Sequence, residues 1–193
     1  TANGGINTGA SGGVSSVITV YGTLTSKGNS QDNAITAGKV IVGSGGVLDI
    51  SGENGLSLRG MNQGGSTDFT GVFTVEKGGA FFADCDNFNV EVPAPGSGFP
   101  AGSNPENAFN IPENYLPIDC EVRTENGGID LIRKSTGEVY TGPMAIHEYH
   151  DWPDHWNRKD ETGHWEECLY EGCDHTRNYE PHSYNQNTWE CTV

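Results

Sequence analysis

Residues 1–146 of this 193-residue chain contain no histidine and no tryptophan. All six histidines and all four tryptophans therefore lie in the last 47 residues, together with three of the five cysteines. Any catalysis that needs a histidine is excluded from the first 146 residues. The crowding of these residues at one end predicts either a metal that holds this segment together or an aromatic surface that binds a ligand.

Basic residues are scarce, because ten Lys and Arg face 26 Asp and Glu and give a net charge of −16. Binding to nucleic acid depends on Lys and Arg that displace counterions from phosphates, and anionic membrane surfaces also attract basic proteins. We therefore expect neither as a partner. No apolar run approaches the ~18 residues of a membrane-spanning helix, so membrane insertion is not expected either.

The first residues, TANGGINTGASGG, have neither the basic start nor the apolar centre of a signal peptide. The segment is compatible with the mature part of an exported protein. The cysteine count is odd, which makes a complete disulfide framework unexpected and leaves Cys85 with Cys120 as one candidate bridge.

Composition divides the chain into two regions. Nineteen of the 28 glycines lie in the first 80 residues, among many Ser, Thr, Asn, Val and Ile. The last 47 residues are instead aromatic, acidic and rich in metal-ligating side chains. We expect a β-domain over residues 1–146 and a small Cys/His/Trp-rich module over 147–193.

Three segments of the first region align beneath one another: ITVYGTLTSKGNSQDNAI (18–35), VIVGSGGVLDISGENGL (40–56) and FTVEKGGAFFADCDNFNV (73–90). Each has a short β-branched strand, a turn with glycine, a second apolar strand and a polar bend with asparagine. The asparagines are Asn33, Asn54 and Asn87. Residues 61–71 have the polar composition of a loop inserted into one repeat.

A repeat near 21 residues built from short strands favours a parallel β-solenoid, since each coil buries its apolar face only against its neighbour. An antiparallel sandwich with similarly spaced turns is the alternative. The repeats resemble the glycine-rich right-handed β-helical domains of secreted and cell-surface proteins of gut bacteria, some of which bind carbohydrate. The resemblance implies a mostly β fold, a right-handed parallel β-helix, over about the first 145 residues.

Residues 93–117 are rich in Pro, Gly, Asn and Ser and predict a long loop, because proline and glycine weaken strands. Residues 118–146 predict a hairpin in which GIDLIRK and GEVYTG are joined through Ser135, Thr136 and Gly137. We expect this hairpin to cap the open end of the solenoid.

The C-terminal region repeats a short pattern. His147-Glu-Tyr149 and His182-Ser-Tyr184 share an H-x-Y unit, followed by Trp165 with Cys168 in one case and Trp189 with Cys191 in the other. The pattern resembles the Cys/His repeats H-x-[YFW]…H-W-x-x-C…C…H-x-[YFW] of surface proteins of Gram-positive gut bacteria. This chain departs from them by having four residues rather than two between Cys168 and Cys173.

A 47-residue segment without a long apolar run is too small to be stable through burial alone, so we expect a structural zinc and a zinc-ribbon-like module. Zinc takes four thiolate and imidazole ligands, often from closely spaced cysteines. The predicted ligands are Cys168, Cys173 and His182, with either His164 or His147 as the fourth. Cys191 has no assigned role.

Two alternatives to zinc remain open at this stage. In an oxidising compartment Cys168 and Cys173 could form a disulfide. The histidines could also be simply solvated, without a metal. If zinc is present, we expect His150, His155 and His175 to be surface residues. The aspartates of this region, Asp151, Asp154, Asp160 and Asp174, would form a solvated acidic face.

We expect a non-catalytic, secreted or cell-surface bacterial module for adhesion, spacing or glycan binding, whose partner is a glycan or a component of a host or bacterial surface. Candidate aromatic ligand-binding residues are Phe69, Phe73, Trp152 and Trp156. The alternative is a polysaccharide lyase or glycoside hydrolase on a β-helix that uses Asp84 and Asp86 as paired carboxylates. These two acids can also be interpreted simply as solvated residues at a bend of the chain, and this interpretation favours the non-catalytic module.

Overall fold

The computed structural model describes residues 2–3, 5–8, 16–63, 66–89, 107–125, 128–140 and 143–183. Within these ranges the fold is mostly β, without an α-helix and hence without a helix that could span a membrane. One short 3-10 turn, η2 (Glu113–Tyr115), is present. The strands are β1 (Ala2–Asn3), β2 (Ile6–Asn7), β3 (Val17–Val20), β4 (Thr23–Lys27), β5 (Ile35–Ala37), β6 (Lys39–Val42), β7 (Val47–Leu58), β8 (Met61–Gln63), β9 (Ser66–Asp68), β10 (Phe73–Val75), β11 (Ala80–Asn89), β12 (Phe109–Asn110), β13 (Cys120–Glu125), β14 (Gly128–Arg133), β15 (Met144–His147), β16 (Arg158–Lys159), β17 (Gly163–Glu167) and β18 (Thr176–Pro181).

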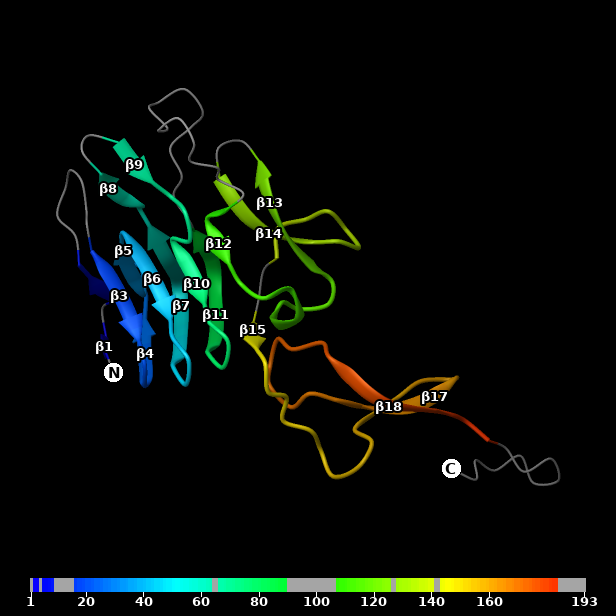
Figure 1. The fold of residues 1–193 in the computed structure, drawn as a ribbon. Helices are drawn as coiled ribbons and strands as arrows, with labels where there is room; N and C mark the ends of the chain where they lie inside the picture. The colour runs from blue at the N-terminus through cyan, green and yellow to red at the C-terminus, as the bar shows by residue number, and fades with distance from the viewer. Residues whose placement is uncertain are drawn as a thin grey trace.

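Two sheets made largely of parallel strands form the main body of the molecule (Figure 1). One contains β3, β6, β10 and β12, all parallel. The other is seven-stranded and follows the order β1, β4, β7, β11 and β15, with β5 and β2 beside it. Each strand β3, β6 and β10 of the four-stranded sheet is followed along the chain by a strand of the seven-stranded sheet, namely β4, β7 and β11.

The strand register pairs the residues at which the three aligned segments begin. Ile18 pairs with Val40, and Val40 pairs with Phe73. Farther along, Asn54 of β7 lies opposite Asn87 of β11. Because these pairings are parallel, each aligned segment lies directly on the next one, with the same strand and bend positions above one another.

The core lies between the two sheets and follows the two-residue alternation of strands. In β6 the buried residues are Val40 and Val42, and the intervening Ile41 is only partly buried. Phe73 makes edge contacts with Phe81 at a centroid distance of 4.9 Å and with Phe109 at 5.9 Å. These contacts join β10, β11 and β12, so aromatic rings as well as aliphatic side chains fill the interior.

One glycine allows two stacked strands to approach at a bend. Gly52 has a φ of +102°, and a Cβ atom there would lie 2.2 Å from the Gly28 carbonyl oxygen. Real Cβ contacts are essentially never so short, so a side chain at this position would push the two neighbouring strands apart. The glycine-rich composition therefore has a direct structural reason at this bend.

The last part of the main body differs in detail from the predicted hairpin. The observed hairpin pairs β13 with β14, whereas Ser135, Thr136 and Gly137 form a turn after which only an isolated bridge joins Ile132 to Val139. The Gly-Glu-Val run therefore does not become a full strand. Of the predicted loop over residues 93–117, residues 93–106 lie outside the described residues.

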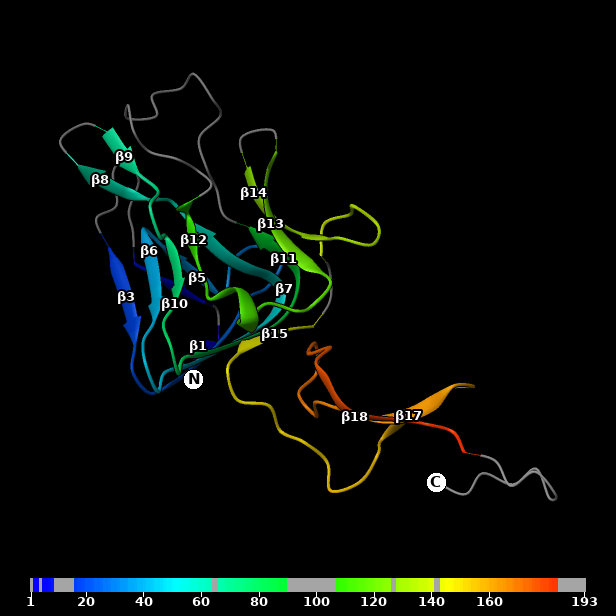
Figure 2. The same cartoon turned by 45° about the vertical axis from the view of Figure 1, so that its right-hand side comes forward.

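Strand β15 is the last strand at one edge of the seven-stranded sheet. The chain then continues into the tail, which we define as residues 148–183. Strand β15 pairs antiparallel with β11, so that His147 lies opposite Ala80. The predicted domain boundary thus falls within β15. Beyond it, β16, β17 and β18 form a small antiparallel sheet (Figure 2). The tail is therefore connected to the main body directly through a strand.

The structure does not contain the candidate disulfide bridge between Cys85 and Cys120. Both residues are buried thiols that are not joined by a disulfide. Burial raises the pKa of Cys120 to about 11, with a smaller opposing effect from Arg133. Cys120 therefore packs as a small apolar residue in the core.

Candidate metal centre

Four side chains converge where β15 meets the tail. Ligand atoms of His147, His150, Cys168 and Cys173 all lie within 4.8 Å of one another. Tetrahedral zinc with bonds of about 2.0–2.3 Å would hold its ligand atoms roughly 3.3–3.8 Å apart. The observed spacing is close to that of a tetrahedral site, so this group could hold a metal ion.

The fold brings these residues together from the edge of the seven-stranded sheet and from the tail. His147 is the last residue of β15, and His150 follows three positions later. Cys168 comes directly after β17, and Cys173 lies at the end of the next turn. The Cys173 amide closes that turn by donating to the Tyr170 carbonyl at 3.1 Å. The group therefore joins the edge of the large sheet to the tail.

Gly172 fits the cysteine turn against β15. Its φ is +80°, and a Cβ atom there would lie 2.4 Å from the Pro143 carbonyl oxygen and 2.6 Å from the Met144 nitrogen. Its own carbonyl accepts a hydrogen bond from the Ala145 amide at 3.4 Å. Only glycine combines this backbone angle with so close an approach. The turn that carries Cys173 is thus positioned by the absence of a side chain.

The imidazole of His147 is oriented for metal binding. Its Nδ1 lies 2.7 Å from the Tyr149 carbonyl oxygen, which accepts only from a protonated nitrogen. Nε2 then carries the lone pair, and this atom is buried without a hydrogen-bond partner. Metal-ligating histidines usually donate through their other ring nitrogen in this way. A metal at the group would satisfy a buried nitrogen that otherwise costs free energy.

Burial favours the uncharged forms of His147, His150 and Cys173 when no metal is bound. It lowers the pKa of His147, and burial with the nearby His175 and His147 lowers the pKa of His150 to about 4. The same burial raises the pKa of the Cys173 thiol to about 12. Neutral imidazoles are ready to bind a metal, whereas the thiols must first lose their protons.

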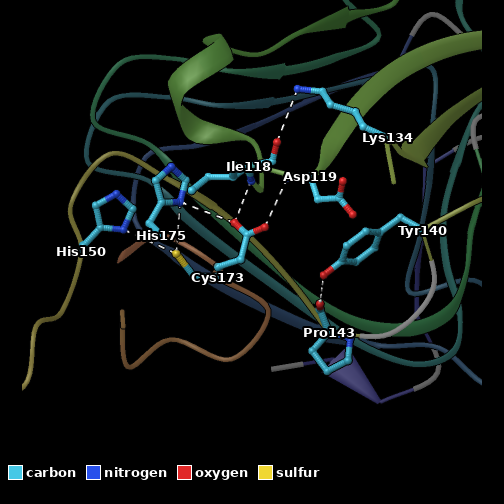
Figure 3. A network of polar contacts seen from close by, with 9 residues as sticks. Ile118, Asp119, Lys134, Tyr140, Pro143, His150, Cys173 and His175 are labelled. Carbon is cyan, nitrogen blue, oxygen red and sulfur yellow. Dashed lines mark hydrogen bonds and ion pairs between the residues drawn. The ribbon is translucent and has the colours of Figure 1, made fainter. Parts of the chain in front are cut away.

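The residues after Cys173 fasten the tail to the main body (Figure 3). The Asp174 carboxylate accepts hydrogen bonds from the Ile118 amide at 2.7 Å and the Asp119 amide at 3.3 Å. His150 and His175 each place Nδ1 3.5 Å from the Cys173 sulfur. Asp174 is therefore a docking residue rather than part of a solvated acidic face, and His175 lies against the candidate centre.

The observed group contains His150 in place of the predicted His182, and of the two residues predicted as the fourth ligand it contains His147 rather than His164. Cys168, Cys173 and His147 are brought together as candidates, but His182 and His164 lie elsewhere in the tail. Their rings contact each other at a centroid distance of 4.8 Å, and His182 Nε2 lies 2.9 Å from the Asp160 carbonyl oxygen. His182 was predicted as a ligand because it begins the second H-x-Y unit. Cys191, the cysteine that follows this unit in the sequence, lies outside the described residues.

The candidate ligand that sequence reasoning missed is His150, which the prediction treats as a surface residue. Its ring is partly buried and packs against His147 at a centroid distance of 4.8 Å and against His175 at 4.4 Å. The signal was the spacing His147-x-x-His150, which resembles the short intervals common between zinc ligands. His155 is exposed, as expected.

Two of the four aromatic residues proposed for ligand binding are core residues. Phe69 and Phe73 are fully buried in the apolar core, so neither ring can contact a ligand. Trp152 is partly buried beside Cys168 and Cys173, with the Arg177 guanidinium 4.6 Å from its ring centroid. Trp156 is 42% exposed and lines two cavities. Only Trp156 offers a substantial open surface.

Comparison with protein-family models, curated proteins and solved structures found no match to this chain.

Proposed function

We propose that the chain is a non-catalytic module of an extracellular bacterial surface protein, in which a structural zinc fastens the tail to a β-solenoid. The observation that carries the proposal is the position of the four-residue group. His147 belongs to the large sheet, whereas Cys168 and Cys173 belong to the tail. A metal bound there would link the two regions, which suits a spacer or adhesion module.

The β-solenoid is supported by the parallel registers. Val17 lies beside Lys39 in one sheet, and Thr23 lies beside Val47 in the other, so both strands of a segment advance together. Phe73 lies beside Phe109 in the following step. We take the solenoid to be a right-handed β-helix, because parallel crossover connections are right-handed in about 98% of cases.

Zinc is the metal that best fits these ligands. Two thiols and two imidazoles match a Cys2His2 set, and zinc and other soft metals prefer thiolate over carboxylate ligands. Four protein ligands fill a tetrahedral site and leave no position for a reacting water. This argues for a structural rather than a catalytic role, so we assign the metal to stability.

The surface role follows from the resemblances of both regions to bacterial secreted and cell-surface repeats, with a glycan or another surface component as the partner. For the rival function, polysaccharide degradation, paired carboxylates would be required. Asp84 is exposed on β11 opposite Ser51, and the Asp86 side chain lies outside the described residues. No contact of the described residues favours that function, so we do not propose it.

The test is elemental analysis with a thiol count on the native protein, on Cys168→Ser and on Cys120→Ser. We expect one zinc per chain in the native protein and in Cys120→Ser, and none in Cys168→Ser. Cys120 is the matched control, because it is equally buried but lies in the main core. Absence of metal together with two missing thiols would replace the zinc by a Cys168–Cys173 disulfide.

The non-catalytic part of the proposal has its own test. The protein is incubated with acidic and neutral polysaccharides, and the release of unsaturated or reducing ends is measured. We expect no release. Turnover that is abolished by Asp84→Asn or Asp86→Asn would establish an enzyme instead.

A further inference from the structure

Trp156 stands between two cavities of opposite charge in the tail. The cavity on one side has a volume of about 550 Å³ and is lined by acidic residues that include Asp154, Glu166 and Glu180. The cavity on the other side measures about 370 Å³ and is lined by Trp156, Asn157, Arg158, Lys159 and His164. We call the second one the β16 pocket, because Arg158 and Lys159 form that strand.

The basic character of the β16 pocket is unexpected for this chain. Residues 147–193 contain eleven acidic residues and only three basic ones, Arg158, Lys159 and Arg177. Arg177 is paired with Glu166, and Arg158 is paired with Glu167 at 2.7 Å. Lys159 is exposed, and none of the ion pairs given for the described residues includes it. Two of the three cations therefore border one pocket.

The pocket is framed by fixed groups. The Asn157 side chain donates to the Glu167 carbonyl at 3.0 Å and accepts from the Glu167 amide at 2.8 Å, which fixes the start of β16 against β17. The Trp156 ring lies over the His164 ring, with centroids 4.0 Å apart and planes inclined by 32°. An aromatic face is thus held beside two cations on a paired strand.

His164 provides a second sign of a ligand. Its side chain is buried, with 7% of the residue exposed, and its Nε2 has no hydrogen-bond partner. Buried polar atoms without partners are rare in native proteins and call for an explanation. His164 lines the β16 pocket next to Trp156, so a hydroxyl of a bound ligand would be the group that reaches this nitrogen. Bound in that way, the ligand would remove the unsatisfied group.

We propose that the β16 pocket binds a pyranose that carries a carboxylate, such as a uronic or sialic acid residue. Lys159 and the exposed side of Arg158 would contact the carboxylate, since charge-assisted hydrogen bonds are the stronger ones. The Trp156 ring would pack against the apolar C–H face of the sugar. A volume of about 370 Å³ is at the lower end of small-molecule sites, which suits one or two sugar units.

Electrostatics sets the orientation of such a ligand. The acidic cavity on the far side of Trp156 repels a carboxylate, so the charged group must face β16. The net charge of −16 does not prevent binding, because at physiological ionic strength charges beyond about 8 Å are largely screened. This inference rests on the proposed surface function, of which it names the ligand class.

The test is isothermal titration calorimetry of the zinc-loaded protein with digalacturonate, a glucuronate disaccharide and sialyllactose, each against its neutral counterpart. We expect at least one carboxylated sugar to bind at least tenfold more tightly than the neutral sugar. Trp156→Ala and Lys159→Gln should each weaken that binding at least tenfold. The control Lys77→Gln removes the same charge from an exposed site on the main body and should leave binding unchanged.

Three results would overturn the inference: no saturable binding of any carboxylated sugar, equal binding of neutral and carboxylated sugars, or binding unaffected by both tail substitutions. The zinc content of every sample is measured alongside. A sample with one zinc per chain and no sugar binding would overturn the sugar pocket while the zinc-stapled module stands. A sample without zinc would overturn the metal, whatever the calorimetry shows.

Discussion

The two large sheets and the tail bury very different side chains. Between the sheets, Val40, Leu48, Phe73 and Phe81 are fully buried with many other apolar residues. Across the described residues 148–183, the buried residues are Gly163, His164, Glu166, Cys168 and Cys173, which include no aliphatic or aromatic hydrocarbon side chain. Burial can stabilise the sheets, whereas the tail needs ligands and hydrogen bonds.

A metal would contribute more to the stability of the tail than to that of the sheets. A metal that binds only the folded form contributes its binding free energy to folding, about 10–16 kcal/mol in zinc-finger peptides. The sheets do not need this contribution, because their apolar core is continuous. The tail has no comparable source of stability, so it should respond to metal removal while the sheets do not.

Metal removal is the largest expected effect. A strong chelator should change tryptophan emission and raise amide hydrogen exchange in the tail by at least about 100-fold, because ligand binding free energy is lost. Far-ultraviolet circular dichroism of the sheets should change little. Emission reports residues 147–193 and not the sheets, since all four tryptophans lie after residue 146. Loss of the sheet signal in parallel would show that the two regions fold as one unit.

A core substitution tests the other half of the comparison. Phe81→Ala removes a fully buried ring and should lower the free energy of unfolding of the sheets by about 3–5 kcal/mol. Denaturant titrations followed by circular dichroism measure this change. At low denaturant the variant should still bind one metal. A loss of metal under conditions where the sheets stay folded would contradict the separation of the two regions.

The identity of the ligands gives the next effect in size. His150→Ala should weaken zinc affinity by more than about 100-fold, since losing a ligand costs at least as much as losing a group that supports one. His182→Ala is the matched control and should leave affinity within about threefold, because His182 contacts His164 and Asp160 instead. Competition with a chromophoric chelator measures both. The reverse order would restore the ligand set predicted from the sequence.

Much of the fold could be anticipated from repeated residues. The alignment of Ile18, Val40 and Phe73 coincides with the observed parallel register. Three of the four candidate ligands could be anticipated from the sequence, because Cys168, Cys173 and His147 stand out by spacing and repetition. The spacing His147-x-x-His150 hints at His150, but its approach to the cysteines depends on how the chain after β15 turns back toward the cysteine turn. That path depends on tertiary contacts such as the Leu169 amide donating to the Asp151 carbonyl at 2.8 Å.

The same limit explains the errors over the aromatic residues and the hairpin. Phe69 and Phe73 look like candidate binding residues in a polar stretch, but the apolar interior claims both. Good turn residues at Ser135, Thr136 and Gly137 predict a hairpin, yet β14 pairs with the preceding β13 instead. Local turn chemistry specifies where a chain can bend, and packing decides which strand becomes the partner.

A smaller effect is expected from the turn that carries Cys173. Gly172→Ala should weaken zinc binding by more than tenfold, because its Cβ would collide with Pro143 and Met144 on the adjoining strand. Gly137→Ala is the matched control, since Gly137 also has a positive φ, +72°, but open space around its Cα. The control carries only the conformational cost of about 1 kcal/mol. Equal effects would show that the close approach to β15 is unimportant.

The smallest expected effect is the pH response of the metal-free tail. The pKa of His150 falls from its ordinary 6.5 to about 4 on folding, and that of His147 is also lowered. The unfolded tail therefore binds more protons between these pH values, so its folded form loses stability as the pH falls from 6.5 toward 4. Tryptophan emission of the metal-free protein should shift toward that of the unfolded tail over this window. His150→Phe should reduce the shift, since phenylalanine cannot take up the proton. A response that is flat in this window would mean that the metal-free tail no longer buries its histidines.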